Sequence, residues 1–179
     1  MLKIMGDDSL RLQVGDKAPD FTLPSQTGEN VSPSNFLGKK KVVLYFYPMN
    51  ESPVCTREAQ SFRDSYEVFK GLEAQVIGVN SSSVESQKAF AEHHKLPFLL
   101  LSDVDNKIRK LYGATSSFGA LPGRVTYVID KKGIVRHVFS SLLQPKKHVK
   151  EALDVLRKIN APEEGVCIGG KQETNLSRL

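Results

Sequence analysis

The chain has 179 residues, with a hydrophobic fraction of 40% and a charged fraction of 25%, which is typical of one soluble globular domain. No apolar run approaches the roughly 20 residues that a membrane span needs, so we expect no membrane partner. The net charge of +5 arises from lysine clusters at expected turns and helix starts, without interleaved aromatic residues, so we expect no nucleic-acid partner.

The two cysteines, Cys55 and Cys167, are too few for a disulfide-stapled secreted fold and favour a reducing compartment. Residues 1–8 are too short and too acidic a segment to be a signal or transit peptide. We therefore expect a cytoplasmic protein, or a protein of the plastid stroma if a transit peptide has been removed.

The N-terminal half begins with residues 1–13, which lack periodicity and are expected to be flexible. A short hairpin is expected around Gln26-Thr27-Gly28, and the β-branched and aromatic run 41–47 predicts a central parallel strand. The first strong helix starts near Pro53 and ends at Gly71. Its inward face is predicted to carry Cys55, Ala59, Phe62, Tyr66 and Phe69.

Strands and helices alternate in the rest of the chain. A strand is predicted at 74–79, followed by a helix with a capping box at 82–85 that runs to about His94, and by a strand at 98–101. Next comes a short helix capped by Asp103, with an apolar face of Val104, Ile108, Leu111 and Tyr112. A hairpin of strands 124–130 and 134–140 and a helix that begins at Pro145 complete the prediction. This order predicts an α/β domain over residues 14–160 with a mixed sheet, followed by a mobile tail at 161–179.

Cys55 stands in the first turn of the first long helix, where unpaired backbone N–H groups and the helix macrodipole favour a thiolate. Ser52 precedes this helix and can donate a hydrogen bond to the sulfur or to an incoming oxygen, while Pro48 and Pro53 restrict the backbone of the loop. The alternative is a buried and inert cysteine, because free cysteine is often a structural residue.

The pattern Pro48-x-x-x-Ser52-x-x-Cys55 resembles the active-site motif of the peroxiredoxins. Further stretches, at 45–48, 62–66, 96–103 and 119–124, resemble the peroxiredoxin Q branch, also called bacterioferritin comigratory protein. The resemblance extends from about Val14 to about Lys158. It implies a thioredoxin-like α/β sandwich, whose central mixed sheet is flanked by helices, with an added N-terminal hairpin.

The resemblance also implies a function and a set of residue roles. The function is a thiol-dependent peroxidase that reduces hydrogen peroxide and organic hydroperoxides through a cysteine sulfenic acid. Cys55 matches the peroxidatic cysteine, Ser52 the hydroxyl that bonds sulfur and peroxide, and Pro48 the shielding proline. Arg124 matches the arginine that stabilises the thiolate and polarises the peroxide, and Glu51 is given a supporting role.

The sequence departs from the branch where many members carry a resolving cysteine, because that position is Gln60 here. Sulfenic Cys55 is then reduced directly by an external thiol, or Cys167 reaches it from the tail. The implied reductant is thioredoxin, glutaredoxin or a low-molecular-weight thiol. The missing cysteine also leaves open a second function, a catalytically weakened thioredoxin-fold module for interaction or holdase activity.

Other chemistries have little support in the sequence. The adjacent pair His93-His94 is expected to point in two directions along a helix, so we predict no metal site. The chain carries neither a phosphate-binding glycine motif nor a paired CxxC, so we expect no cofactor. We expect a monomer or a weak homodimer.

Overall fold

The computed structural model describes residues 11–116 and 122–160. Most of the segments expected to be flexible, residues 1–10 and the tail 161–179, lie outside the described residues. The strands are β1 (Leu23–Pro24), β2 (Asn30–Val31), β3 (Lys41–Phe46), β4 (Ala74–Asn80), β5 (Leu99–Ser102), β6 (Val125–Ile129) and β7 (Val135–Ser140). The helices are α1 (Pro53–Asp64), α2 (Tyr66–Gly71), α3 (Val84–His94), α4 (Lys107–Tyr112) and α5 (Pro145–Asn160), with a 3₁₀ turn at Pro33–Phe36.

Five of the described strands form one mixed sheet in the order β5-β4-β3-β6-β7. β3 lies at the centre, pairs in parallel with β4 and antiparallel with β6, and is buried along its whole length. Its β-branched and aromatic residues suit a strand covered on both faces. The predicted mixed sheet is therefore confirmed, and β1 and β2 form the additional N-terminal hairpin.

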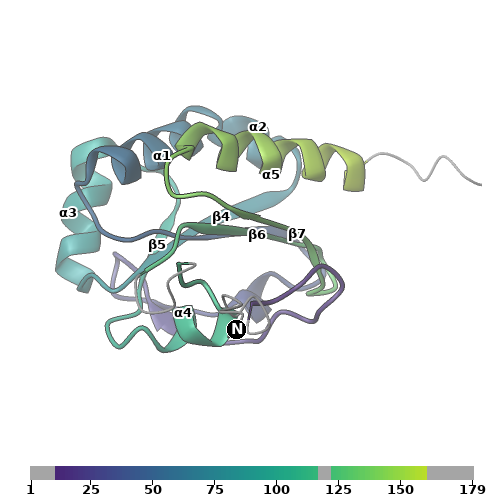
Figure 1. Cartoon of the computed structure of the whole chain (residues 1–179), viewed down its shortest axis with the longest axis horizontal. Helices are drawn as coiled ribbons and strands as arrows, with labels where there is room; N and C mark the ends of the chain where they lie inside the picture. The colour runs from purple at the N-terminus through teal and green to yellow at the C-terminus, as the bar shows by residue number, and fades with distance from the viewer. Residues whose placement is uncertain (1–10, 117–121, 161–179) are drawn as a thin grey trace, which may run out of the picture.

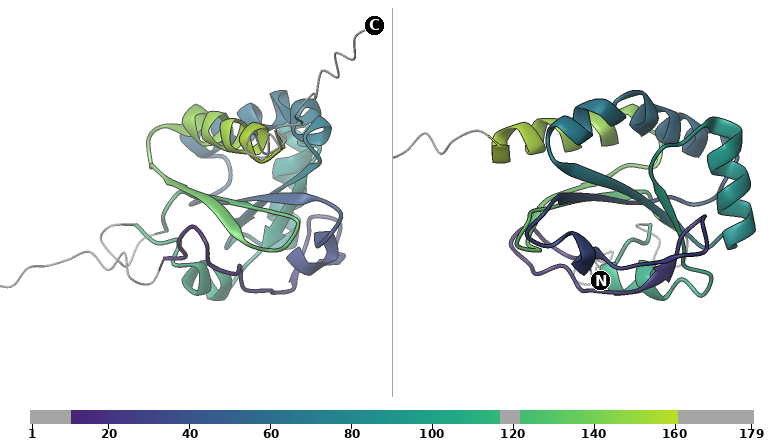
Figure 2. Two further views of the ribbon diagram at one scale, coloured as in Figure 1. Left: turned by 90° about the vertical axis from the view of Figure 1, so that its right-hand side faces the viewer. Right: turned by 180° about the vertical axis from the view of Figure 1, so that it is seen from behind.

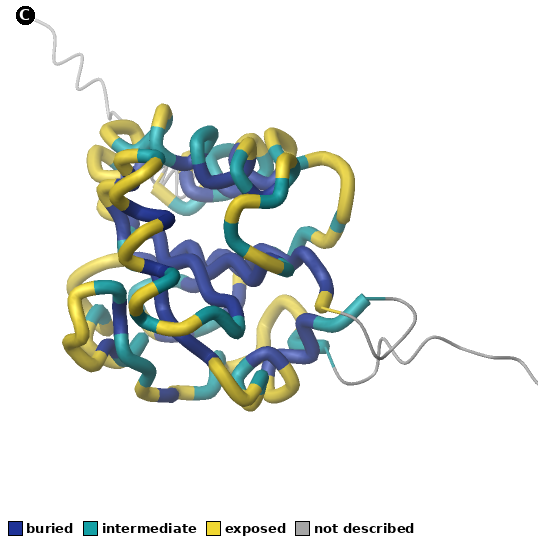
Figure 3. The backbone as a smooth tube through the Cα atoms, turned by 90° about the vertical axis from the view of Figure 1, so that its left-hand side faces the viewer, coloured by how far each residue is buried: buried dark blue, intermediate teal, exposed yellow. Residues whose placement is uncertain are grey.

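The helices cover the two faces of the sheet unequally (Figure 1). α1, α2 and α5 lie over one face, and α4 lies across the other face together with the N-terminal segments, as the reverse view also shows (Figure 2). α3 stands at the end of the sheet beside β5. The tube coloured by burial shows the central strands enclosed between more exposed outer segments (Figure 3).

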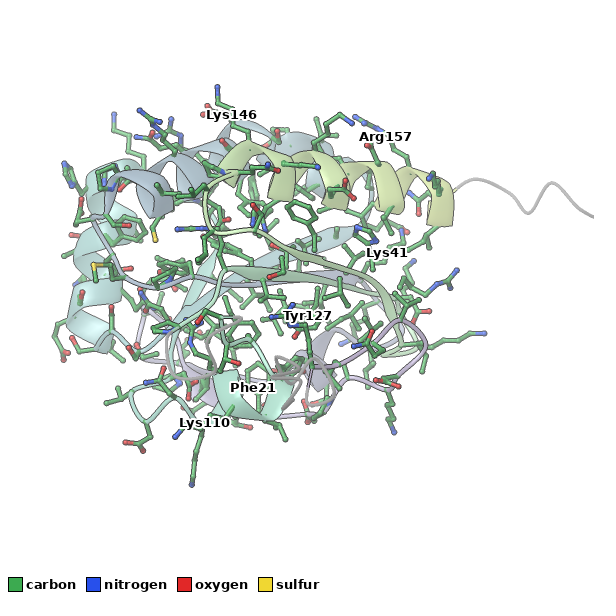
Figure 4. The ribbon with its side chains drawn as sticks, viewed as in Figure 1. Phe21, Lys41, Lys110, Tyr127, Lys146 and Arg157 are labelled. Atoms are coloured by element: carbon green, nitrogen blue, oxygen red, sulfur yellow. The ribbon has the colours of Figure 1, made fainter. Side chains whose placement is uncertain are left out.

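Alternate residues of the strands feed two separate hydrophobic cores, because successive side chains of a strand point to opposite faces. Tyr45 and Val43 belong to the core beneath α1, α2, α3 and α5, whereas Leu44 and Phe46 belong to the core beneath α4. In the second core Phe21 and Tyr127 lie between the sheet and α4, while Lys110, Lys146 and Arg157 point outward from their helices (Figure 4).

The long helix predicted from Pro53 to Gly71 is interrupted at Ser65, where φ is −99° and ψ is 5°. Serine is a poor residue for a helix interior because its hydroxyl competes for backbone groups. The apolar face nevertheless continues across the break, since Phe62 and Phe69 are both fully buried. The prediction was wrong about continuity but right about this face.

Two helix starts also differ from the prediction. Ser83, not Ser82, is the N-cap of α3, and its hydroxyl accepts a hydrogen bond from the Ser86 N–H. The short helix starts only at Lys107, although the Asp103 carboxylate still accepts hydrogen bonds from the Ile108 and Arg109 N–H groups. Two of its four predicted apolar residues, Val104 and Leu111, are exposed.

Among the described residues, we find no helix that combines the length and the apolar character required to cross a bilayer.

Gly78 in β4 tests how tightly the core beneath α1 is packed. A Cβ at this position would lie 2.8 Å from Tyr45 Cζ and 2.9 Å from Leu100 Cδ2. We expect Gly78→Ala to lower the free energy of unfolding by about 1–3 kcal/mol, measured by urea denaturation, because overpacking displaces core side chains. Gly71→Ala is the matched control, since a Cβ there meets no atom within 4 Å, and it should not destabilise the protein. Equal stability of the two variants would contradict this packing.

Candidate functional site

The loop between β3 and α1 is held by a partly buried network of polar side chains. The Tyr47 hydroxyl donates to Asn50 Oδ1 at 2.8 Å, and Asn80 Nδ2 donates to the same oxygen at 3.1 Å. Gln87 from α3 accepts from Asn50 Nδ2 at 3.0 Å and donates to the Leu101 carbonyl at 2.8 Å. The loop that precedes Cys55 is therefore connected to β4, β5 and α3 before any ligand arrives.

Ser52 is the N-cap of α1, and Pro53 occupies the first helical position, as the sequence predicts. The Ser52 hydroxyl oxygen accepts a hydrogen bond of 3.3 Å from the Cys55 N–H. Because the oxygen acts as the acceptor in this bond, the hydroxyl proton is still available to a neighbouring group. Cys55 lies in the first turn of the helix with 1% of its surface exposed, and the half-buried Pro48 is the second residue of the loop that follows β3.

Arg124 directly precedes β6 and contacts Cys55 in α1, although 69 residues separate them in the chain. Antiparallel pairing places Val125 of β6 opposite Phe46 of β3, so the residue before Val125 lies beside the loop that follows β3. The Arg124 guanidinium is buried, and its Nη2 donates to Cys55 Sγ at 3.2 Å. A charge-assisted bond from a buried guanidinium stabilises the thiolate relative to the thiol.

The remaining donors of Arg124 fix its orientation. Nη1 donates to Glu58 Oε1 at 3.1 Å, and Nε donates to the Leu142 carbonyl at 3.1 Å. Burial disfavours the charged guanidinium, but Glu58 and Cys55 more than compensate and raise the pKa of Arg124. A cavity of about 390 Å³ lies against the same side chain and is lined also by Ser116, Gly123, Ser140, Ser141, Leu142, Leu143 and Gln144.

Glu58 is the important site residue that our reading of the sequence missed. It lies three residues after Cys55 on the same helical face, and its side chain is fully buried. Burial raises the pKa of Glu58 to about 8, although Arg124 acts in the opposite direction. Its Oε2 has no hydrogen-bond partner within the described residues, so this oxygen suits a protonated carboxyl group. The available signal was an acid at i+3 on an otherwise apolar stripe.

His148 lies behind Glu58, with 3.7 Å between Nε2 and Glu58 Oε2. It is fully buried and held by the Ser141 carbonyl at 2.8 Å and by Thr126 Oγ1 at 2.8 Å. Burial lowers the pKa of His148 to about 4, so the ring is neutral at physiological pH. Arg124 is the charged group that forms hydrogen bonds with both Cys55 and Glu58.

Arg109 is a second buried arginine that the sequence analysis did not single out. Its Nη2 donates to the Tyr47 carbonyl at 2.6 Å, and its Nη1 donates to the Gly123 carbonyl at 2.7 Å. It therefore joins the residue before Pro48 to the residue before Arg124. Burial lowers the pKa of Arg109 to about 10, which leaves it charged at neutral pH.

Glu51 was expected to support the thiol site, but its described contacts lie elsewhere. Its carboxylate is held by His93 Nδ1 and His94 Nε2, each at 2.9 Å, and its backbone is left-handed with φ of 62°. The expectation that the adjacent histidines point apart is therefore wrong. The two rings, whose centroids are 4.1 Å apart, converge because tertiary packing brings the β3–α1 loop against the end of α3.

The structure brings together Cys55, Ser52 and Arg124, as the sequence predicts. Gln60 lies half-buried on α1, at the position where the resemblance implies a resolving cysteine in many members of the branch. Cys167, the candidate resolving thiol, lies outside the described residues. Residues 119–121, which belong to one of the stretches that resemble the peroxiredoxin Q branch, also lie outside them. Their arrangement relative to Cys55 stays a prediction.

Comparison with known proteins places the chain in a family. Residues 14–138 match the family model described as the AhpC/TSA family. Among curated proteins, the chain is 49% identical over 150 residues to "Peroxiredoxin Q, chloroplastic" of Triticum aestivum, covering 83% of this chain and 69% of that protein. The protein of the same name from Sedum lineare is 53% identical over 146 residues, covering 81% and 78% of the two chains.

The chain belongs to the AhpC/TSA family, in its peroxiredoxin Q branch. As a peroxiredoxin it is a thiol-dependent peroxidase, which supports the enzyme over the alternative of an interaction or holdase module. The relatives are named as chloroplastic, so they support the plastid alternative, and the cytoplasmic expectation finds no support.

Solved structures agree with the peroxiredoxin fold. Peroxidoxin BcpB of Mycobacterium tuberculosis superimposes with a TM-score of 0.78 at 36% identity, covering 84% of this chain and 100% of that chain. A PrxQ variant of Xylella fastidiosa gives a TM-score of 0.75 at 22% identity over 83% of this chain and 98% of that chain, which bears on the fold alone. The predicted thioredoxin-like fold is confirmed.

The high pKa of Glu58 predicts an unusual pH dependence for the reactivity of Cys55. Below about pH 8 the Glu58 carboxyl group is neutral, so it does not offset the positive charge of Arg124 beside the sulfur. Above about pH 8 it becomes a carboxylate, whose negative charge disfavours a nearby thiolate. In a Cys167→Ser background, we expect Glu58→Gln to match the wild-type alkylation rate near pH 6.5. Above about pH 8, where the wild-type carboxylate is charged, it should react faster than wild type, by at most about 10-fold for one pKa unit of interaction.

Iodoacetamide alkylation of Cys55, followed by mass spectrometry from pH 6 to 10, measures this effect. Glu67→Gln is the control, because Glu67 is an acid with 85% of its side chain exposed on α2. Superimposable pH profiles for wild type and Glu58→Gln would contradict an effect of the Glu58 charge on Cys55.

Proposed function

We propose that this peroxiredoxin reduces hydrogen peroxide and organic hydroperoxides with Cys55 as the attacking sulfur. The observation that carries the proposal is the position of Arg124, which donates to Cys55 Sγ at 3.2 Å and also lines the adjacent cavity. Arg124 lines this cavity and Cys55 does not, so the proposal assigns the first contact with an entering peroxide to the guanidinium. Peroxide binding and thiolate stabilisation are thereby assigned to one side chain.

The proposed chemical step is a displacement at oxygen. The thiolate of Cys55 forms a bond to the nearer peroxide oxygen, the O–O bond breaks, and the leaving oxygen takes up a proton to depart as water or an alcohol. The sulfur is oxidised to sulfenic acid and the peroxide is reduced by two electrons. Charge develops on the leaving oxygen, where a guanidinium stabilises the transition state more than the ground state.

Supporting roles follow from the surrounding contacts. Ser52 keeps its hydroxyl proton for the sulfur or the peroxide while its oxygen caps α1. Pro48 limits the access of water to the buried thiol. Neutral Glu58 orients Arg124 without cancelling its charge, and we assign it the part of a positioning residue. Glu51 has no part in this step.

Regeneration needs a thiol reductant. One external thiol condenses with sulfenic Cys55 to a mixed disulfide and releases water, and a second thiol then releases the Cys55 thiol and leaves as a disulfide. We propose this route because Gln60 replaces the usual resolving cysteine. The reductant is thioredoxin, glutaredoxin or a small thiol, and Cys167 in the tail 161–179 is the alternative resolving residue.

The cellular setting is also a proposal. The chloroplastic names of the relatives favour the plastid stroma for this chain. We propose that residues 14–160 act as the enzyme domain, in a monomer or weak homodimer. The expectation of flexibility was wrong for residues 11–13, because the Arg11 side chain donates to the Gly113 and Thr115 carbonyls and the Leu12 N–H donates to the Tyr112 carbonyl.

The assignment of Arg124 is testable with rapid kinetics. We expect Arg124→Ala to lower the second-order rate constant of Cys55 oxidation by hydrogen peroxide by about 10²–10³, the usual effect of removing one oxyanion donor. Arg124→Lys should fall between this variant and wild type, because it keeps the charge and loses the planar fork. The rate is measured by stopped-flow fluorescence or by trapping the sulfenic acid, with Cys55→Ser as the blank.

Arg136→Ala is the matched control, since Arg136 is an exposed arginine of the adjacent strand β7 and should leave the rate constant unchanged. Urea denaturation shows whether each variant folds. A folded Arg124→Ala protein that reacts as fast as wild type would refute the role of this side chain.

The route of regeneration has its own test. After one equivalent of peroxide without reductant, we expect mass spectrometry under non-reducing conditions to find sulfenic acid at Cys55. Cys167→Ser should also turn over at the wild-type rate with a saturating external thiol, because the external thiol attacks Cys55 directly. A Cys55–Cys167 disulfide, together with slow turnover of Cys167→Ser, would instead identify Cys167 as the resolving residue.

A further inference from the structure

A second cluster of chemically active side chains lies where the β3–α1 loop meets the C-terminal end of α3. Glu51 comes from the loop, one residue before the N-cap of α1, and His93 and His94 are the last two residues of α3. Their ligand atoms all lie within 4.8 Å of one another. The peroxidase chemistry described above makes no use of these three residues.

Adjacent histidines can reach one point here because they use different ring nitrogens. His93 presents Nδ1, which is close to its backbone, and His94 presents Nε2, at the far end of its ring. Each nitrogen lies 2.9 Å from a separate oxygen of the Glu51 carboxylate. The three groups therefore converge although the two histidines start on different sides of the helix.

We propose that Glu51, His93 and His94 form a binding site for a borderline divalent transition ion such as Zn²⁺. Two imidazoles and one carboxylate are a donor set that zinc accepts, with water completing a tetrahedral site. Ligand bonds of about 2.1 Å place tetrahedral donors about 3.4 Å apart. The two nitrogen–oxygen distances of 2.9 Å would therefore lengthen slightly, and the wider spacings, which lie within 4.8 Å, would shorten. The nitrogen-rich donor set disfavours Mg²⁺ and Ca²⁺, which prefer oxygen ligands.

The surroundings prepare this site for a cation. His94 has 10% of its side chain exposed and packs edge-on against Phe90, with 5.0 Å between ring centroids, so one ligand is fixed in advance. His93 has 66% of its side chain exposed and can rotate to complete the coordination. The negative end of the α3 macrodipole adds attraction for a cation.

One nearby cation must be considered, because the His94 carbonyl accepts a hydrogen bond of 2.8 Å from Arg63 Nη1. The same guanidinium forms an ion pair with Asp64 at 3.0 Å, which reduces its repulsion of a metal ion. A bound ion would connect the loop that carries Ser52 directly to α3. It would therefore stabilise the folded protein through this connection, without contact to Cys55 or Arg124.

Isothermal titration of the full-length chain with Zn²⁺ tests the proposal. Both cysteines are replaced, as Cys55→Ser and Cys167→Ser, so that no thiolate supplies a ligand. We expect one equivalent of Zn²⁺ to bind. His93→Ala and Glu51→Gln should each weaken binding by more than about 10-fold, because loss of an outer-sphere partner alone already costs about 10-fold. Excess Mg²⁺ should not compete. Zn²⁺ should also raise the melting temperature, and this rise should disappear in His93→Ala.

His137→Ala is the matched control, because His137 also pairs with a carboxylate, Glu151 at 2.8 Å, but outside the three-residue cluster. It should bind Zn²⁺ as tightly as the parent protein. His93 is exposed, so His93→Ala is expected to fold, and circular dichroism checks this. Absence of binding to the parent protein, or equal affinity and thermal shift in His93→Ala and His137→Ala, would overturn the proposal.

Discussion

One guanidinium organises the reactive end of this molecule. Arg124 donates to the sulfur of Cys55 with one nitrogen and to the carboxyl group of Glu58 with another, while both partners belong to the same helix. Because all three groups are buried, water screens their interactions weakly. A single side chain therefore holds the sulfur and the acid in one buried set of contacts.

The fold places that guanidinium through strand order and not through proximity in the chain. β6 returns antiparallel beside β3, which brings Arg124 level with the loop where β3 ends. Arg109 then ties the carbonyl of Tyr47 to the carbonyl of Gly123, so the two chain segments that flank the site share one buried cation. Backbone as well as side chains is therefore hydrogen-bonded at this junction.

The charge states of the site residues depend on how deeply those residues are buried. Glu58 lies against a cation, yet the loss of hydration raises its pKa to about 8, and the same effect keeps His148 neutral with a pKa of about 4. A fully ionised acid would compete with the sulfur for Arg124. Keeping both neighbours neutral leaves the positive charge available to Cys55.

The sequence by itself determined the alternation of strands and helices, the helix start at Ser52 and Pro53, and the placement of Cys55 in the first turn, because these depend on local periodicity and capping. The family resemblance implied a role for Arg124 at the sulfur, but only the tertiary structure decided the geometry of that contact and the partnership with Glu58. It also decided that His93 and His94 converge on Glu51, against our expectation. These contacts join segments distant in the chain, and their energies depend on burial, which a linear pattern does not specify.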